Sequence, residues 1–257
     1  MLKIENINVG YDGTTVLHAI NAQFEPSTLT ALVGPNGTGK SSLLKAMAGL
    51  IPSKGGVRLD GASLTGDMRL KAIAYMPQDT GAQSSLTVLE VVLLGRLRSL
   101  GLRVGDDIRV QAVTALKRFR LEAFQDRAIG SLSGGQRQLV FLAQSLFRGP
   151  EVLLLDEPTA ALDLRHQLIV LERIVETCKT SGMIAIAAMH DLTLAARFAD
   201  RILFLHDGHV AADGSPAEVL TPQILEQVYR VAAEVQLGPS GALHVSPVRA
   251  LSDMKVN

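Results

Sequence analysis

The stretch from Gly34 to Ser41 has the residue types and spacing of a loop that wraps phosphate groups. It reads GPNGTGKS and fits the pattern G-x-x-x-x-G-K-[ST]. Glycines let the backbone turn tightly, so that consecutive N–H groups point at phosphate oxygens, and the following helix adds its positive dipole end. Lys40 supplies a cation for the β- and γ-phosphates, and the Ser41 hydroxyl is a ligand for Mg²⁺. The candidate phosphate-binding residues are Gly34, Pro35, Asn36, Gly37, Thr38, Gly39, Lys40 and Ser41.

Two acidic residues follow the apolar run Val152–Leu155. Four apolar residues indicate a buried strand, and Asp156 stands at its carboxyl end, where ligands bind in open α/β sheets. We expect Asp156 to hold Mg²⁺ through water and Glu157 to polarise an attacking water as general base. Two solvated acids at an ordinary strand end are the alternative, which the phosphate-binding loop disfavours.

The elements that must position these residues alternate between short apolar runs and amphipathic stretches. This pattern predicts an α/β fold with a largely parallel sheet, of the P-loop NTPase type, preceded by antiparallel N-terminal strands. The expected strands are 2–9, 16–24, 29–33, 57–59, 73–75, 152–155, 183–188 and 201–205. The expected helices outside the insertion described next are 42–48, 164–180, 192–198, 216–219 and 222–231.

Residues 87–148 differ in character from the rest and predict an inserted α-helical subdomain. Thr87 and Glu90 form a capping-box pattern, and apolar residues in 106–120 fall on one helical face. Ser133 precedes a helix that extends through Phe147. We therefore expect one domain over 1–257. Its core covers about 1–86 and 149–235, its helical subdomain about 87–148, and its short tail 236–257.

The composition limits which partners the protein binds and in which cellular compartment it functions. The 257 residues include 25 Lys and Arg and 25 Asp and Glu, and a net charge of zero argues against a nucleic-acid-coating surface. Cys178 is the single cysteine, which favours a reducing compartment. No apolar stretch approaches the roughly 20 residues that span a bilayer, and we find no secretory signal. A mean hydropathy of +0.24 suggests an apolar core or a surface covered by a partner.

Residues 132–136 spell LSGGQ, and with the two motifs above, in this order, the chain resembles the ABC ATPases from Leu2 to about Val231. The resemblance implies that two ATP molecules lie between two head-to-tail copies of the chain. In that dimer each LSGGQ motif closes on the nucleotide held by the other copy. The motif residues that would do so are Ser133, Gly134, Gly135 and Gln136.

The resemblance also implies roles for isolated residues that would otherwise be unremarkable. Tyr11 stacks on adenine, Gln78 reaches Mg²⁺ and the attacking water, and His190 contacts the γ-phosphate. Asp163 belongs to a loop, 161–163, that crosses the dimer interface. Ser42 keeps a hydroxyl where the family more often has Thr, and Ala160 stands where Ser is common. The implied catalytic set is Glu157, His190, Gln78 and Lys40, and the implied metal-binding set is Ser41, Gln78 and Asp156.

One nucleotide-binding domain without a membrane segment resembles the separate ATPase subunit of a bacterial importer. Residues 91–96 and 189–201 further resemble the ATPases of iron–siderophore, haem and cobalamin uptake, although that subgroup usually has a proline where Leu97-Arg98 stand. The implied partners are a second copy, a membrane permease and, indirectly, a substrate-binding protein, at the cytoplasmic face of the inner membrane. We expect the permease to dock near residues 80–100, where Val91 and Leu94 would be the test positions.

Three alternatives remain open from the sequence. The chain could be a soluble ABC ATPase of the iron–sulfur assembly type, or an importer ATPase for another substrate. It could also hold ATP without hydrolysing it, which the intact Lys40, Asp156, Glu157 and His190 oppose.

Overall fold

The central sheet places the carboxyl ends of its parallel strands along one edge. The computed structural model describes residues 1–78, 84–97, 105–160, 162–238 and 241–251. Within these residues the sheet order is β10-β9-β3-β8-β7-β6, and every neighbouring pair is parallel except β9 with β10. The strands are β3 (Leu29–Val33), β6 (Ile73–Met76), β7 (Val152–Asp156), β8 (Ile184–Ala188), β9 (Arg201–His206) and β10 (His209–Gly214).

Both faces of this sheet are covered, which explains why its strands are continuously apolar. Every residue of β3, β7 and β8 is buried. Alternate side chains enter two different cores: Leu153 and Leu155 pack on one side, and Val152 and Leu154 on the other. A strand buried on both faces cannot alternate apolar with polar residues, so short apolar runs were the correct sequence signal for it.

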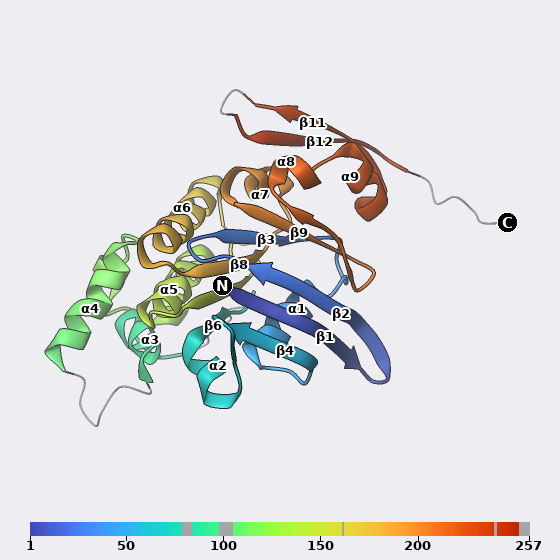
Figure 1. Ribbon diagram of the computed structural model, residues 1–257. Coiled ribbons are helices and arrows are strands. Elements are labelled where there is room, and N and C mark those ends of the chain that lie inside the picture. Colours follow the sequence, from blue (N-terminus) through green and yellow to red (C-terminus); the bar gives the residue numbers. More distant parts are fainter. Residues whose placement is uncertain (79–83, 98–104, 161, 239–240, 252–257) are drawn as a thin grey trace.

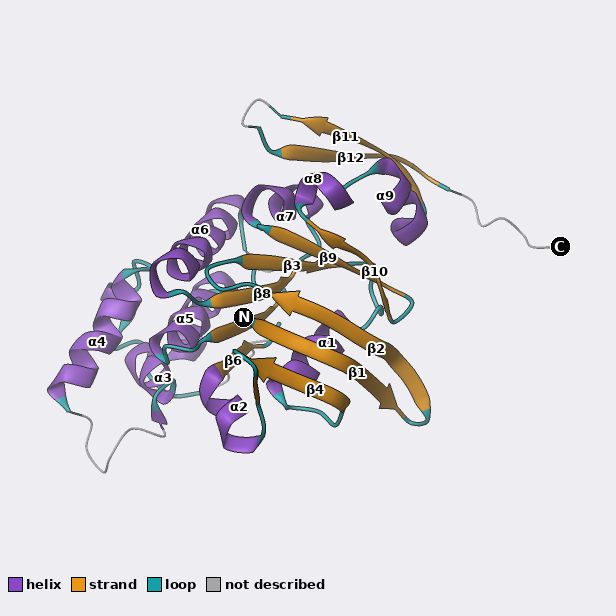
Figure 2. Cartoon of the chain, in the orientation of Figure 1, coloured by secondary structure: helices purple, strands orange, loops and turns teal. Residues whose placement is uncertain are grey.

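An antiparallel sheet and one helix cover the first face. The sheet order is β2-β1-β4-β5, and α1 lies between this sheet and the central one (Figures 1 and 2). Their buried side chains, among them Phe24 and Met47, share one core with the central strands. The elements are β1 (Leu2–Tyr11), β2 (Thr14–Phe24), α1 (Lys40–Ala48), β4 (Lys54–Leu59), β5 (Ala62–Ser63) and α2 (Gly66–Ala72).

The expected helical insertion is confirmed between β6 and β7. Thr87 opens its first helix with a complete capping box, in which the Thr87 side chain accepts from the backbone N–H of Glu90 and the Glu90 carboxylate accepts from the backbone N–H of Thr87. Val92, Leu116 and Val140 are fully buried between the three helices. The helices are α3 (Val88–Leu94), α4 (Asp106–Lys117) and α5 (Gly134–Phe147), with short 3-10 turns η2 (Glu122–Phe124) and η3 (Ile129–Ser131).

Helices and a hairpin cover the second face at the C-terminal end. The elements are α6 (Leu164–Ser181), α7 (Leu192–Phe198), α8 (Pro216–Val219), α9 (Pro222–Tyr229), β11 (Val231–Leu237) and β12 (Leu243–Ala250). The sequence shows no clear period in the expected tail, 236–257, and the structure places β12 and the end of β11 there, paired antiparallel. Most side chains of β12 are exposed, and Pro247 lies within it, so the sequence signal for a strand is weak there. The short elements β5, β10 and α2 were also missed.

No helix in the described ranges combines the length and the apolar character that crossing a bilayer demands.

Candidate functional site

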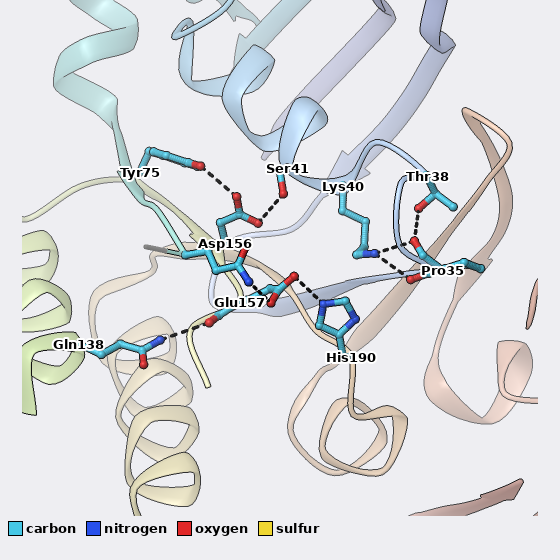
Figure 3. Close-up of polar contacts among 11 residues, drawn as sticks. Pro35, Thr38, Lys40, Ser41, Tyr75, Gln138, Asp156, Glu157 and His190 are labelled. Carbon is cyan, nitrogen blue, oxygen red and sulfur yellow. Dashed lines mark hydrogen bonds and ion pairs between the residues drawn. The ribbon is translucent and has the colours of Figure 1, made fainter. Parts of the chain in front are cut away.

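The predicted phosphate-binding loop connects β3 to α1 at the carboxyl edge of the central sheet. Gly34 leaves β3 with φ +147°, and a Cβ there would lie 2.1 Å from the carbonyl oxygen of Leu205 on β9. The close approach of β9 therefore requires glycine at the first position. The Lys40 ammonium lies beneath the loop and donates to the carbonyl oxygens of Gly34 at 2.8 Å and Pro35 at 2.9 Å (Figure 3). Thr38 also donates to Pro35, at 2.9 Å.

The Lys40 side chain is 6% exposed and faces the two candidate acids. Burial lowers the pKa of Lys40, and the nearby carboxylates of Glu157 and Asp156 oppose that shift. A desolvated ammonium interacts strongly with anions because little water competes for it. The Lys40 ammonium is thus close to the place where a phosphate group bound by the backbone N–H groups of the loop would lie.

Asp156 and Ser41 form a set of oxygen atoms suited to Mg²⁺. Oδ1 of Asp156 accepts a hydrogen bond from the Ser41 hydroxyl at 2.8 Å, although 115 residues separate them. Oδ2 accepts from the Tyr75 hydroxyl at 3.0 Å, and burial raises the pKa of Tyr75 well above its usual range. Hydroxyl and carboxylate oxygens in contact are hard ligands of the kind Mg²⁺ prefers. The residues present therefore fit that metal.

Glu157 lies at the centre of the site, and its carboxylate is held from two sides. Gln78, which follows β6, donates to Oε2 at 2.6 Å, and Nε2 of His190, which follows β8, lies 2.5 Å from Oε1 (Figure 3). The backbone of Glu157 has φ +52°, a left-handed conformation that costs a non-glycine residue about 1–2 kcal/mol. Gln138 on α5 donates to its carbonyl oxygen at 3.2 Å. The structure thus aims a carboxylate, restrained by three segments, toward the phosphate-binding loop.

Tyr11 stands at the entrance of the loop. Its ring is 45% exposed, and its hydroxyl lies 3.2 Å from the hydroxyl of Ser42 on α1. A flat, exposed aromatic ring beside the loop offers a stacking surface for a planar base.

The LSGGQ residues form the N-terminus of α5. Ser133 and Gln136 make a reciprocal capping box, at 3.2 Å and 3.1 Å. Among the described residues no hydrogen bond joins 133–136 to 34–41 within the chain. Asp163 caps α6 by accepting from the backbone N–H of His166, which lowers the pKa of Asp163. Ala161, expected in the same loop, lies outside the described residues.

Sequence reasoning missed two residues of the site, Tyr75 and Gln138. Tyr75 is opposite Leu154 in the parallel pairing of β6 with β7. Its contact with Asp156 therefore depends on the register of these two strands. Gln138 carries a detectable signal, because it is the polar residue that precedes the apolar run Leu139–Val140 and is only 3% exposed. A buried amide in a helix ordinarily has a partner.

The region in which we expect the permease to dock exposes leucine side chains, and it also contains a residue that is buried. Leu94 and Leu97 are 40% and 60% exposed and line a hollow with Lys71 and Arg148. Val91 is only 3% exposed and belongs to the core between α3 and α5. A charge at Val91 would therefore disrupt packing, so Val91 was wrong as a test position. Residues 79–83 and 98–100 of this region lie outside the described residues.

Comparison with known proteins gives a consistent result. A family model described as ABC transporter matches residues 17–160, more than half of the chain. The iron(3+)-hydroxamate import ATP-binding protein FhuC of Bacillus subtilis is 39% identical, over 93% of this chain and 91% of that protein. The hemin import ATP-binding protein HmuV of Jannaschia sp. is 40% identical, over 94% and 92%. The cobalamin import ATP-binding protein BtuD of Halobacterium salinarum is 38% identical over 96% of this chain, which spans 63% of that longer protein.

Two solved structures share the fold over most of its length. A metal-chelate type ABC transporter in an inward-facing conformation has a TM-score of 0.84 at 25% identity, covering 96% of this chain and 97% of that one. A dimeric ATP-binding cassette with ADP and phosphate, in a post-hydrolysis state, has a TM-score of 0.76 at 29% identity, covering 84% and 99%.

Proposed function

The chain belongs to the ABC transporter family of ATPases, and we propose that it powers the import of an iron chelate, haem or a cobalamin through a separate membrane permease. The observation that carries the chemistry is the Glu157 carboxylate, held by Gln78 and His190 beside the phosphate-binding loop. The substrate class rests on the relatives, which are import subunits for hydroxamate-bound iron, haem and cobalamin.

ATP is the substrate that this loop and its neighbours would bind. The backbone N–H groups of 34–41 would surround the β- and γ-phosphates, and the Lys40 ammonium would turn from its two carbonyl partners to them. Tyr11 would stack on the adenine. Ser41, Asp156 and Gln78 would hold Mg²⁺, which when bound neutralises charge that develops on the transferred phosphoryl group.

Hydrolysis at this site requires a positioned water and a base. A water in line with the γ-phosphorus would form a new P–O bond as the bond to the β-phosphate oxygen breaks. The Glu157 carboxylate accepts the proton from this water, and ADP leaves with the negative charge. Gln78 and His190 fix the two carboxylate oxygens, so the base meets the water in one orientation. His190 would in addition contact the γ-phosphate.

The second copy of the chain would complete each site. The N-terminus of α5, at Ser133, Gly134, Gly135 and Gln136, presents the helix dipole and the backbone N–H groups of Gly134 and Gly135, which suit a phosphate group, while the capping box uses those of Ser133 and Gln136. Among the described residues no hydrogen bond joins this N-terminus to the loop of its own chain. It would therefore serve the nucleotide of another copy, and the loop with Asp163 would cross the dimer interface nearby. A dimeric relative of the same fold supports this arrangement.

The permease would bind the hollow at Leu94 and Leu97 and hold the chain at the cytoplasmic face of the inner membrane. Closure of the two copies around ATP would move the helical insertion, and with it the docked permease. Release of phosphate would reopen the dimer. A substrate-binding protein outside the membrane would deliver the cargo to the permease.

Purification of the tagged chain from detergent-solubilised native membranes, followed by mass spectrometry, tests this proposal. We expect a polytopic permease to co-purify, and its binding protein to bind iron chelates, haem or cobalamin. Co-purification with soluble iron–sulfur assembly proteins alone would overturn the import function and leave the ATPase chemistry standing.

A further inference from the structure

Gln138 is a buried polar side chain to which the mechanism above gives no task. It lies on α5, is 3% exposed and is followed by the fully or nearly fully buried Leu139 and Val140. Its Nε2 donates to the carbonyl oxygen of Glu157 at 3.2 Å (Figure 3). Within the described residues its Oε1 has no hydrogen-bond partner. A buried amide whose oxygen has no partner is costly, so the single hydrogen bond that Gln138 makes needs an explanation.

The acceptor of this bond is the backbone of the candidate base. Glu157 has φ +52°, a conformation that L-residues adopt only when their surroundings hold it. The same carbonyl also accepts from the backbone N–H of Ala160 at 3.3 Å, within the local turn. The turn alone therefore gives this carbonyl oxygen one hydrogen bond. What Gln138 adds is a connection from this peptide to a different element.

That element is the helix that begins with the LSGGQ residues. Ser133 caps α5 five residues before Gln138, and the intervening turns are hydrogen-bonded helix. A helix moves as a rigid unit over so short a distance, so a displacement at Ser133 reaches the Glu157 carbonyl through Gln138. The Glu157 side chain starts from that peptide and ends between Gln78 and His190.

We propose that Gln138 is a positioning residue that couples the placement of α5 to the orientation of the Glu157 carboxylate in the same chain. This inference rests on the proposed function, in which Glu157 is the base and Ser133 contacts the nucleotide of the second copy. Nucleotide bound by one copy then acts, through α5 and Gln138 of the other, on the base of that other copy. The two sites of the dimer are thereby linked without direct contact between the nucleotides.

The first test is Gln138→Leu, which removes the donor and keeps an apolar side chain of similar size. We expect kcat to fall roughly tenfold to a hundredfold, as for other residues that orient a catalytic group. The KM for ATP changes by less than about threefold, because the loop and Tyr11 are untouched. The Hill coefficient for ATP falls toward one. Gln144→Leu, the same change on the same helix without a contact to Glu157, is the control and keeps kcat.

A purely structural role for Gln138 predicts a different pattern, a loss of thermal stability with a parallel rise in KM. We expect the midpoint of thermal unfolding to stay within a few degrees, because the variant also removes the unpaired Oε1. If Gln138→Leu does not fold, Gln138→Met preserves the length of the side chain and is measured in its place.

A double-mutant cycle with Glu157→Gln decides whether Gln138 acts through the base. We expect Gln138→Leu to have no further effect on the residual turnover of Glu157→Gln. A wild-type kcat in Gln138→Leu, or an equal loss in both backgrounds, overturns the inference while the base remains Glu157. Full turnover by Glu157→Gln alone overturns the proposed base, and the inference with it.

Discussion

At the scale of single residues, the site consists of side chains that restrain one another before any ligand binds. Asp156 accepts from Ser41 and Tyr75, and Glu157 accepts from Gln78 and His190. Each carboxylate is therefore oriented through both of its oxygens. Such pre-orientation reduces the entropy that the reaction must otherwise lose. It also makes the two acids non-equivalent, because Asp156 contacts two hydroxyl groups whereas Glu157 contacts an amide and an imidazole.

Replacing Glu157 with Gln removes the base and nearly preserves the shape of the side chain. We expect ATP hydrolysis to fall by about 10²- to 10⁴-fold, the usual contribution of a general base, while ATP affinity is retained. The ATP-bound dimer should accumulate, which size-exclusion chromatography with light scattering detects. Glu151→Gln, at the opposite end of β7, is the matched control and should hydrolyse ATP at the wild-type rate. Rapid turnover by Glu157→Gln would rule out this role.

At the scale of elements, caps and close backbone contacts fix where helices begin and where strands meet. Among the described residues, α3 and α5 begin with a complete capping box, and Glu218 accepts from the backbone N–H and the hydroxyl of Ser215 at the start of α8. The phosphate-binding loop is positioned differently, by direct contact of Gly34 with the backbone of β9. Local sequence specifies the caps, whereas the contact at Gly34 depends on how two strands pack.

Gly34→Ala and Gly37→Ala separate two reasons for glycine within one loop: a positive φ, and a lack of space for a Cβ atom. Both residues have positive φ, but a Cβ at Gly34 meets the Leu205 carbonyl oxygen at 2.1 Å, whereas nothing lies within 4 Å of one at Gly37. We expect Gly34→Ala to lower the free energy of unfolding by about 3 kcal/mol or more, and Gly37→Ala by about 1 kcal/mol. Urea denaturation followed by circular dichroism measures both. Equal losses would show that the contact with β9 contributes nothing.

The capping box of α3 predicts a dependence on pH. Hydrogen bonds from the backbone and then the hydroxyl of Thr87 lower the pKa of Glu90 below its usual 4.5. Because the folded-state pKa is the lower one, the stabilisation is present above pH 4.5 and is lost as pH falls through the folded-state value.

Thr87→Val deletes the hydroxyl and keeps the backbone donor, so the pKa of Glu90 should rise toward its usual value. Carboxyl NMR titration measures that shift. The stability difference between wild type and Thr87→Val should be larger at pH 7 than at pH 3. A difference that is the same at both pH values would contradict the charge-assisted part of the cap.

At the scale of the whole molecule, the parallel sheet gathers the chemistry at one edge and the insertion carries α5 and the hollow at Leu97. The same helical unit thus contacts the proposed base, Glu157, through Gln138 and contains the proposed permease surface. A rigid unit of this kind can transmit ATP binding to the membrane partner.

Leu97→Glu tests the permease surface. Leu97 is 60% exposed, so the change should leave the fold intact, and a charge in the hollow should reduce co-purification of the permease at least about tenfold, as loss of an interface anchor does. Val110→Glu, at a 65% exposed position of α4, is the control and should retain the permease. Full recovery of the permease with Leu97→Glu would place the docking surface elsewhere.

The sequence by itself determined those features whose signal is a motif, a cap or a clear periodicity among neighbouring residues. The phosphate-binding loop, the strand end at Asp156, the caps at Thr87 and Ser133 and the helical insertion are local patterns, and the structure contains each of them. Their local origin is the reason: turns, caps and periodicity depend on residues a few positions apart.

Only the tertiary structure decided which of these residues meet. Gln78 and Glu157 are 79 residues apart, and they touch because parallel strands bring their carboxyl ends to one edge. Tyr75 and Gln138 joined the site through strand register and helix packing, which no local pattern encodes. The hairpin β11–β12 was missed for the same reason: the side chains of its strands are exposed or only partly buried, and the strands are stabilised by each other and by the helices beneath them.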